Sequence, residues 1–458
     1  MKANPANDTD TGEDRSASRA AAAAIVDRLR RAGHEALFVG GCVRDILRGI
    51  EPADYDIATS AHPDQVQALF PRTIPVGAAF GVILVIEGGR RYEVATFRRE
   101  AEYEDGRHPS QVAYTTVEED ARRRDFTVNG LLQDPVTGRI IDCVEGRADI
   151  DHRLVRTIGD PELRFAEDRL RMLRAVRFAA NLDFSIHPET LDAIRRHAKA
   201  IRHISSERIR VELTKILTAG AARRGMELLA DTGLLAEILP EVDRLRRLEQ
   251  PKRFHPEGDV WEHTLRMLTH MRAAAGGLVD ARLAWAVVLH DVGKAVTRTE
   301  DDSGIHFYGH VQKGEEIATS LLQRLKFPAA DTATVLALIH EHMTFMHVRV
   351  MRPGRLKRFL RLSDFSLHLE LHRLDCLGSH GMLDNHDYCR EKLDELTLEA
   401  LHPPRLLSGD DLIALGFSPG PRFKDILRAV EDAQLNDRIT TKEDARKFLE
   451  AMVLQEKK

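Results

Sequence analysis

The stretch LFVGGCVRDILRG at Leu37–Gly49, followed by DYDIA at Asp54–Ala58, decides the fold of the first part of the chain. It predicts a short apolar strand, a glycine turn, a helix and a second strand, in this order. Alternate side chains of a strand point to the same face, so the second strand places Asp54 and Asp56 side by side. Such a carboxylate pair suits a magnesium ion, which prefers carboxylate oxygens and substrate phosphates.

The residues around this pair indicate in which reaction the magnesium would take part. Gly40 and Gly41 let the backbone approach a triphosphate closely, and Arg44 at the start of a helix can bind it through two hydrogen bonds. We therefore predict nucleotidyl transfer with two metal ions. Glu93 in the later stretch RYEVATF has the strand parity of a third carboxylate, although a charge on an edge strand explains it equally well.

Composition narrows the class of protein. The chain has 458 residues, of which 43% are hydrophobic and 30% charged, and its formal net charge is −5. These values predict a soluble chain of several domains and argue against nonspecific nucleic-acid binding. The longest apolar runs are too short to span a bilayer, residues 1–18 lack a secretory pattern, and the cysteines are scattered. We expect a cytoplasmic protein with no membrane partner.

The alternation of apolar runs and turns predicts an α+β fold, in which a head with a small mixed sheet precedes mostly helical regions. The polar segment 247–259 contains two prolines and reads as a linker. We expect a disordered tail at 1–19, the head at 20–159, a helical neck at 160–250, a histidine-rich helical domain at 255–390 and a helical C-terminal tail at 391–458.

A second motif, RRDFTVNGLL, begins at Arg123. A basic–acidic pair beside Asn129 could hold a ribose hydroxyl and orient the sugar. A helix N-cap at Asp125 or Thr127 is the alternative. The arginine run at 122–124 favours a phosphate-binding role.

A third motif, AEDRLRMLRAVRFAA at Ala166–Ala180, predicts one helix on which Glu167, Arg171 and Arg174 share a narrow arc. Asp168 could accept a hydrogen bond from the exocyclic amine of adenine or cytosine, and Arg171 could donate to the ring. Taken alone, the residues favour a salt bridge on a solvated face, which is worth tenths of a kcal/mol.

A fourth motif, SSERIRVEL at Ser205–Leu213, predicts a capped helix on which Arg208 and Glu212 pair as i and i+4 and act as a structural brace.

A set of histidines and aspartates follows in the later helical region. The adjacent pair His290 and Asp291, with more distant partners, makes a workable metal site, because imidazoles and carboxylates suit transition metals. The set comprises His263, His290, Asp291, His310, His340, His342 and Asp375.

In order along the chain, GGCVRD, DYDIAT, EVATFRR, RRDFTVN, EDRLRMLRAVRFA and ERIRVEL resemble the motifs of the class II CCA-adding tRNA nucleotidyltransferases and their poly(A) polymerase relatives. The resemblance covers residues 22–240. It implies a polymerase-β-like nucleotidyltransferase head followed by a neck that binds RNA and nucleotide, a body and a tail. It also implies tRNA as the partner, CTP and ATP as donors, and Mg²⁺ as the cofactor.

The resemblance implies roles for single residues as well. Asp54 and Asp56 match the catalytic, magnesium-binding carboxylates. Asp168 and Arg171 match the pair that selects CTP and ATP without a nucleic-acid template, and Arg208 and Glu212 match a helix brace. The other implied nucleotide-binding residues are Gly40, Gly41, Arg44, Arg124, Asp125, Asn129 and Arg174.

The region behind the neck resembles the HD superfamily of metal-dependent phosphohydrolases. His263, His290, Asp291 and Asp375 match its metal ligands, and His310 and His342 could complete a second metal position. Some bacterial members pair the two domains and remove 2′,3′-cyclic phosphates.

We therefore expect an enzyme that adds CCA to the 3′ end of tRNA. An A-adding tRNA nucleotidyltransferase and a poly(A) polymerase remain alternatives. A phosphohydrolase with a nucleotide-sensing head is an alternative from another class, as is an inert HD fold that binds tRNA. The sequence leaves the oligomeric state open.

Overall fold

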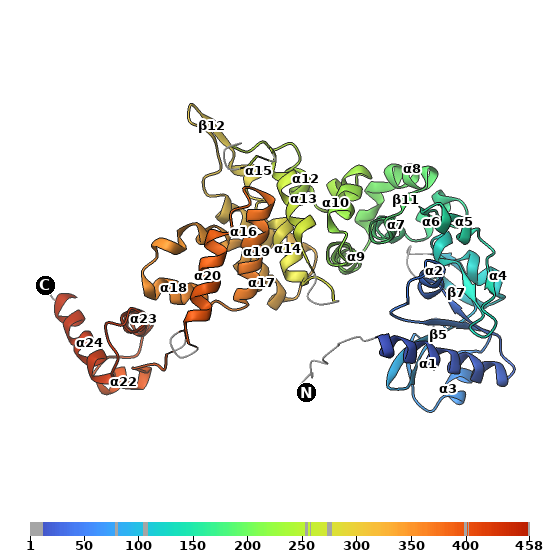
Figure 1. Cartoon of the computed structure of the whole chain (residues 1–458), viewed down its shortest axis with the longest axis horizontal. Coiled ribbons are helices and arrows are strands. Elements are labelled where there is room, and N and C mark those ends of the chain that lie inside the picture. The colour runs from blue at the N-terminus through green and yellow to red at the C-terminus, as the bar shows by residue number, and fades with distance from the viewer. Residues whose placement is uncertain are drawn as a thin grey trace. The chain divides into compact units, whose positions relative to one another are not determined.

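The computed structural model describes residues 12–77, 81–103, 109–251, 255–256, 258–272, 277–397, 401 and 403–456. The chain divides into two compact units (Figure 1). Unit 1 comprises residues 1–243 and 272–279, and unit 2 comprises residues 244–271 and 280–458.

Unit 1 opens with helix α1, Gly12–Arg31. The expected disordered tail of residues 1–19 is wrong from Gly12 onward; residues 1–11 lie outside the described residues. The helix extends into this segment because alanine has the highest helix propensity and the apolar spacing continues through the alanine run. Ala22, Ile25, Val26 and Leu29 are buried on one face of the helix.

A seven-stranded sheet lies in unit 1, in the order β3-β4-β5-β2-β1-β8-β9. The β2–β5 pair is parallel and the other neighbours are antiparallel, so the sheet is mixed as predicted. The short β3 and β8 were not predicted. The strands are β1 (Ala36–Val39), β2 (Asp56–Thr59), β3 (Thr73–Gly77), β4 (Val82–Glu87), β5 (Arg90–Thr96), β8 (Leu132–Gln133) and β9 (Ile140–Ile141).

Apolar side chains of the central strands and of adjoining segments form one core cluster of this sheet. Leu37 and Val39 of β1 cluster with Ala58 of β2, Phe97 and Leu132. Short helices and smaller strand pairs surround the sheet. They are α2 (Gly41–Leu47), α3 (Pro63–Leu69), β6 (Arg98–Tyr103), β7 (Pro109–Tyr114), α4 (Val117–Arg122), η2 (Thr127–Asn129), α5 (Gly146–Asp151), β10 (Leu154–Val155) and β11 (Ser185–Ile186).

The rest of unit 1 is helical, as the periodicity after residue 160 predicts. Helix α7 packs against both α9 and α10. The helices are α6 (Pro161–Glu167), α7 (Leu170–Leu182), α8 (Pro188–His197), η3 (Ala198–His203), α9 (Ser206–Thr218), α10 (Ala222–Asp231), α11 (Leu234–Ile238) and α12 (Pro240–Asp243).

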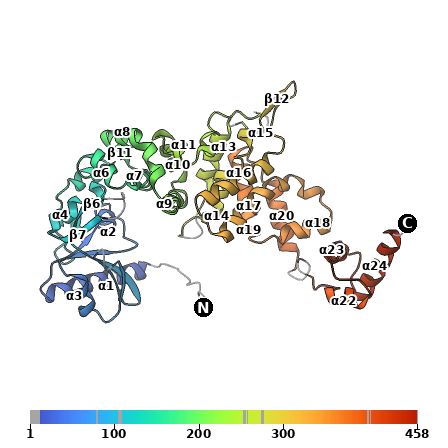
Figure 2. The same cartoon turned by 180° about the vertical axis from the view of Figure 1, so that it is seen from behind.

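Unit 2 is built around five helices, α13, α14, α16, α17 and α19, which gather together in both views (Figures 1 and 2). Their bounds are α13 (Val260–His270), α14 (Ala281–Leu289), α16 (His310–Arg324), α17 (Ala329–Glu341) and α19 (Phe365–Gly378). The hairpin of β12 (Thr299–Asp301) and β13 (Gly304–His306) interrupts a region that was predicted to be helical.

Further helices complete unit 2. Helices α22, α23 and α24 share a separate apolar cluster that includes Leu412, Ile426 and Leu449. The bounds are α15 (Lys294–Thr297), η4 (His342–Val350), α18 (Pro353–Leu360), α20 (Asp384–Glu395), α22 (Gly409–Ala414), α23 (Arg422–Leu435) and α24 (Lys442–Glu456).

The predicted linker at 247–259 is instead tied into unit 2 where it is described. The Gln250 amide donates to the Gly258 carbonyl at 3.0 Å, and the Val260 amide donates to the Leu248 carbonyl at 3.0 Å. Gln250 is 2% exposed. The prolines stop a helix here, but backbone hydrogen bonds still fix the segment.

Across the described residues, no helix combines the length and the apolar character needed to cross a membrane.

Candidate functional site

The carboxylates of unit 1 meet at one end of the central strands. Asp56 begins β2, opposite Val39 at the end of β1. In the parallel β2–β5 pair, Ile57 lies opposite Val94, so the preceding residues Asp56 and Glu93 are neighbours. The glycine turn directly follows Val39, and strand pairing therefore brings the acidic cluster to this turn.

The negative charges of the carboxylates in this cluster repel one another. Burial, together with the carboxylates of Asp54 and Glu93, raises the pKa of Asp56 to about 7, and Arg124 offsets only part of this effect. The side chains of Asp54 and Glu93 are exposed. A group of carboxylate oxygens that lacks a full counter-charge fits a hard divalent cation such as magnesium.

Gly40 gives the turn its shape. Its φ of 76° lies in the left-handed region that glycine adopts without strain. An added Cβ would lie 3.5 Å from Nη1 of Arg124, so this guanidinium lies over the turn. Asp120 anchors Arg124 through a hydrogen bond of 3.0 Å to its Oδ2, and Asp120 is only 1% exposed.

A continuous polar network connects four of the sequence-predicted nucleotide-binding residues. Arg44 Nη1 donates to Asn129 Oδ1 at 2.8 Å, and Asn129 Nδ2 donates to Asp125 Oδ1 at 3.2 Å. Arg174 Nε donates to Asp125 Oδ2 at 2.8 Å. Asp45, which sequence reasoning missed, accepts two hydrogen bonds from Arg44. The network spans α2, η2 and α7 and fixes these side chains together.

Asp125 is ionised within this network. Burial alone would raise the pKa of its carboxyl, but the charge and hydrogen bonds of Arg174 outweigh burial and lower the pKa to about 2. The ion pair therefore holds η2 and α7 together at neutral pH.

The predicted single helix over Ala166–Ala180 is wrong. The chain forms α6, which ends at Glu167, and α7, which begins at Leu170. Asp168 lies at the break with extended backbone angles of −144° and 105°, and its Oδ1 accepts the Leu170 amide at 3.0 Å. The break forms because aspartate binds nearby backbone amides and favours helix starts over helix interiors.

Next to this break, hydrogen bonds with neighbouring residues fix the side chains of Asp168 and Arg171. Asp168 Oδ2 accepts a hydrogen bond of 2.7 Å from Arg208 Nη2. Arg171, which is 7% exposed, donates to the Arg164 carbonyl at 3.1 Å and to Glu167. Each member of the predicted selection pair is thus positioned by a neighbouring residue.

The prediction that Arg208 and Glu212 pair with each other is wrong, because each residue binds a different partner. Arg208 reaches Asp168, and Glu212 accepts a hydrogen bond of 2.7 Å from Arg177. Both links join α9 to the α6–α7 region, because side chains one turn apart on α9 reach different partners across the helix interface. The two residues therefore stabilise the contact of α9 with the α6–α7 region rather than α9 alone.

Unit 2 contains a second cluster, formed by six of the seven predicted histidines and aspartates. The inclusion of His340 is wrong, because this residue is 61% exposed and pairs with Glu315 instead. His263 lies on α13, His290 and Asp291 lie at the end of α14, and Asp375 lies on α19. His310 begins α16, and His342 directly follows α17. Helix packing therefore gathers residues that are up to 112 positions apart in the sequence, between His263 and Asp375.

Three imidazoles are oriented in the same way. Nδ1 of His290, His310 and His342 lies 2.9, 2.9 and 2.7 Å from the carbonyl oxygen three residues earlier. A proton on Nδ1 leaves the lone pair on Nε2, which is the atom that would bind a metal. The buried Nε2 atoms of His310 and His342 make no hydrogen bond. Burial lowers the pKa of His342 to about 4, which keeps this ring neutral near pH 7.

The cluster divides into two groups of three candidate ligands, and within each group the ligand atoms lie within 4.8 Å of one another. Each group combines imidazole nitrogen with carboxylate oxygen, which suits a transition metal. Asp291 belongs to the group of His310 and His342, and its Oδ2 also lies 3.1 Å from His290 Nε2, the residue with which it was predicted to act. The groups are His263, His290 and Asp375, and Asp291, His310 and His342.

A cavity of about 370 Å³ opens beside these ligands. Lys294 lines it, and Lys294 Nζ lies 2.7 Å from Asp291 Oδ2. Gly293 permits the tight packing, since a Cβ there would lie 2.0 Å from the His310 carbonyl oxygen. Sequence reasoning missed Lys294, although its place three residues after Asp291 in HDVGK was a usable signal.

Other residues that the sequence analysis missed support unit 1. Arg164 donates to the carbonyls of Arg122 and Arg124 and to Glu167, and it is 9% exposed. Its position three residues before Glu167 allows that ion pair to be predicted, but the contact with Arg122 spans 42 residues and has no local signal.

Comparisons with known proteins match three segments of the chain. Residues 36–156 match the poly A polymerase head domain, residues 183–245 match the probable RNA and SrmB-binding site of polymerase A, and residues 260–368 match the HD domain. The last match ends before Asp375, which the structure places beside His263 at 3.1 Å.

Relatives and a solved structure extend these matches. The CCA-adding enzyme of Levilactobacillus brevis is 48% identical over 46% of this chain, and the match spans about half of that enzyme's length, 53%. The enzyme of the same name from Bacillus licheniformis is 36% identical over 72% of this chain and 84% of its own. The Bacillus stearothermophilus CCA-adding enzyme in complex with CTP superposes with a TM-score of 0.73 at 30% identity, covering 96% of this chain and 98% of that chain. The chain belongs to the CCA-adding enzyme family of nucleotidyltransferases.

Proposed function

We propose that this chain adds C, C and A to the 3′ end of tRNA with CTP and ATP as donors, in the cytoplasm. The fixed Asp168–Arg171 pair is the observation that carries the proposal. Asp168 is an acceptor held by Arg208, and Arg171 is a donor held by Glu167, so together they match the edge of a cytosine or adenine. Because a selection pair must not move between competing bases, its support by neighbouring side chains favours this role.

In this mechanism the tRNA 3′ hydroxyl attacks the α-phosphate of the bound nucleotide, and pyrophosphate leaves. Asp54 and Asp56, with Glu93 beside them, would hold magnesium, which supplies charge neutralisation for the phosphates when bound. Gly40, Gly41 and Arg124 would receive the triphosphate at the turn. The network of Arg44, Asn129, Asp125 and Arg174 would orient the ribose.

The domain limits belong to the same proposal. We assign the nucleotidyltransferase head to 20–159, the RNA- and nucleotide-binding neck to 160–250, the HD domain to 255–390 and the tail to 391–458. The family matches to the head, to the RNA-binding segment and to the HD domain fall within these ranges and support the assignment.

The test uses three tRNAs that lack CCA, end in C or end in CC. Each is incubated with the purified protein, magnesium and CTP, ATP or both, and the new 3′ ends are sequenced. Complete CCA on the shortest tRNA, with no further addition, supports the proposal. A single A on the CC-ended tRNA alone identifies an A-adding enzyme, and long A tracts identify a poly(A) polymerase.

We propose a second activity for unit 2, a metal-dependent phosphohydrolase. The two groups of candidate ligands and their oriented imidazoles favour this activity over an inert HD fold. Asp291→Asn should abolish metal-dependent phosphate release, whereas Asp56→Asn should leave it unchanged. Protein that neither binds a transition metal nor releases phosphate would instead support an RNA-binding scaffold.

A further inference from the structure

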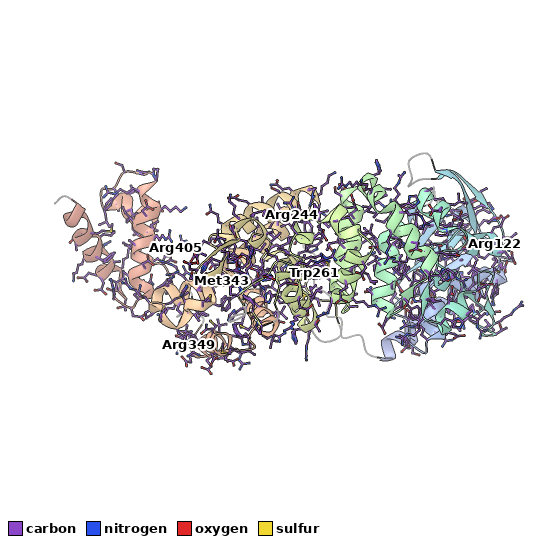
Figure 3. All side chains as sticks on the ribbon, turned by 90° about the horizontal axis from the view of Figure 1, so that it is seen from above. Arg122, Arg244, Trp261, Met343, Arg349 and Arg405 are labelled. Atoms are coloured by element: carbon purple, nitrogen blue, oxygen red, sulfur yellow. The ribbon has the colours of Figure 1, made fainter. Side chains whose placement is uncertain are left out.

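The cavity of unit 2 has an apolar side that the six candidate metal ligands do not use. Ile305, Phe307 and Tyr308 line it after the β12–β13 hairpin, and Met343 and Met346 line it from η4. Met343 is labelled in Figure 3. The volume of about 370 Å³ lies within the range of about 300–1,000 Å³ that is typical of small-molecule sites.

Three of these apolar side chains are exposed although they line a cavity, whereas Ile305 and Phe307 are partly buried. Tyr308 is 76% exposed, Met346 is 62% exposed and Met343 is 36% exposed. Large apolar side chains that gather in the solvent around a pocket indicate a ligand that covers them. Methionine is suited to such a surface because its flexible thioether adapts to a flat partner.

The Tyr308 ring is backed on one face. It stacks on His306 with ring centroids 5.2 Å apart and an interplanar angle of 12°. His306 Nε2 lies 2.7 Å from Ser303 Oγ and 3.2 Å from Asp301 Oδ1, both at the hairpin turn. The hairpin therefore holds His306, and His306 holds the aromatic ring in one orientation while most of its surface stays open.

The polar part of the cavity lining suits an anion. The side chain of Lys294 is 8% exposed and lies 2.7 Å from Asp291 Oδ2, and it donates to Gln250 Oε1 at 2.6 Å. Lys294 Nζ also lies 5.4 Å from the centroid of the Phe307 ring, so the polar and apolar parts of the lining adjoin. His290, Asp291, His310 and Asp375 also line the cavity. Metal ligands beside a fixed cation form the natural place for a phosphate.

We propose that Tyr308, backed by His306, is a stacking platform that binds the nucleobase of a nucleoside phosphate whose phosphate lies at the six-ligand cluster. Tyr308 is then a specificity-determining residue, because it separates nucleotides from phosphate esters without a ring. The inference rests on the proposed phosphohydrolase function of the same pocket. Aromatic rings bind bases of any sequence by stacking, so we expect selection for a base but weak discrimination among bases.

Photo-crosslinking locates the base directly and needs no turnover. The full chain, purified without chelator, is irradiated with 8-azidoadenosine 3′-monophosphate, and the adducts are mapped by mass spectrometry. An adduct on the segment that contains His306 and Tyr308 is the expected result. Adducts confined to other parts of the chain would overturn the proposal.

Equilibrium dialysis of adenosine 3′-monophosphate then measures the contribution of the ring. Tyr308→Ala should weaken binding about tenfold, which corresponds to the usual range for one stacked base, and Tyr308→Phe should change it by less than about twofold. CTP binding by unit 1 serves as the folding control and should be equal in all proteins. Equal nucleotide binding by wild type and Tyr308→Ala would contradict the platform.

Kinetic measurements test the stacking platform separately from the phosphohydrolase function on which it rests. In Tyr308→Ala the KM for adenosine 3′-monophosphate should rise about tenfold, while the KM for glycerol 2-phosphate, which has no ring, should stay unchanged. If wild type hydrolyses neither ester, the phosphohydrolase function fails and the crosslink still decides the platform. Equal effects on both esters would overturn the platform alone. A short RNA that ends in the same 3′-phosphate shows whether the nucleotide is free or terminal.

Discussion

The acidic cluster of unit 1 and the histidine cluster of unit 2 are built in opposite ways. In unit 1, Asp54 and Glu93 are exposed, and the burial of Asp56 together with their charges raises the pKa of Asp56 to about 7. In unit 2, His263 and Asp291 are 0% and 3% exposed, and backbone carbonyls orient the neighbouring imidazoles. We expect the first cluster to bind a cation that arrives with the substrate and the second cluster to hold a resident metal.

This difference indicates which groups supply the metal affinity of each site. Magnesium keeps much of its water and binds through a few carboxylates together with substrate phosphates, so an open site of this kind fills during the reaction. A site of buried imidazoles and carboxylates loses little freedom on binding a transition metal and should keep it through purification.

Among the variants that test this comparison, we expect the largest change in activity from a substitution of Asp56. Asp56→Asn keeps the shape of the side chain but removes a carboxylate oxygen from the cluster, so kcat for nucleotide addition should fall by about 10²–10³-fold or more. Radiolabelled CTP incorporation into tRNA measures this loss, and the metal content of unit 2 should stay unchanged. Turnover like that of wild type in this variant would refute the role of the cluster.

The next largest effect concerns the resident metal. His342→Ala removes one candidate ligand from a buried group, and metal affinity should fall by at least about 10–100-fold. Inductively coupled plasma mass spectrometry of desalted protein measures the bound metal. His340→Ala is the matched control, because His340 lies two residues away, is 61% exposed and pairs with Glu315. Equal metal content in both variants would argue against the site.

A smaller effect sharpens the account of nucleotide selection in unit 1. Arg208→Ala releases Asp168, so the preference for CTP and ATP over UTP and GTP should fall about tenfold, as for loss of one charge-assisted hydrogen bond. Competitive incorporation with all four nucleotides measures the preference. Arg177→Ala is the control, since it breaks the link to Glu212 without touching Asp168. A preference lost equally in both variants would mean that the brace acts only on stability.

The smallest effect is the pH dependence of stability in unit 1. The pKa of Asp125 is about 2 in the folded chain, below the ordinary value of about 3.9. A lowered carboxyl pKa adds stability above pH 4 that is lost as the pH falls toward 2, and its size is about 2–3 kcal/mol. Asp125→Asn should lower Tm by about 5–10 °C at neutral pH, with a gap that narrows below pH 4. Calorimetry from pH 6 to pH 3 measures the gap, and a gap that is constant with pH would contradict the ion-pair account.

Local patterns were sufficient for several predictions. The comparisons confirm the family and the mixed α+β fold that the ordered motifs predicted. The strand positions of Asp56 and Glu93 depend on neighbouring residues, so they can be read directly from the sequence. The predicted strand position of Asp54 is wrong, because β2 begins only at Asp56. The assigned roles of these residues stay predictions that the experiments above test.

Predictions that depended on tertiary contacts were less successful. The helix break at Asp168 follows from a side chain that binds the Leu170 amide, which helical periodicity does not report. The partner of Arg208 lies 40 residues away at the break between α6 and α7, so the i,i+4 rule suggested the wrong residue. The hairpin that positions His306 and Tyr308 is short and polar, and it lies in a region whose other segments are helical.

The most direct test measures CCA addition and its dependence on added magnesium in one preparation. Desalted wild-type protein and Asp56→Asn are each incubated with a tRNA that lacks CCA, CTP and ATP, with and without magnesium, and the 3′ ends are sequenced. The account predicts that wild type appends CCA and then stops, only when magnesium is added, and that the variant appends nucleotides at least about 10²-fold more slowly. Addition that is equally efficient without added magnesium, addition by the variant at the wild-type rate, or no addition by wild type would contradict it.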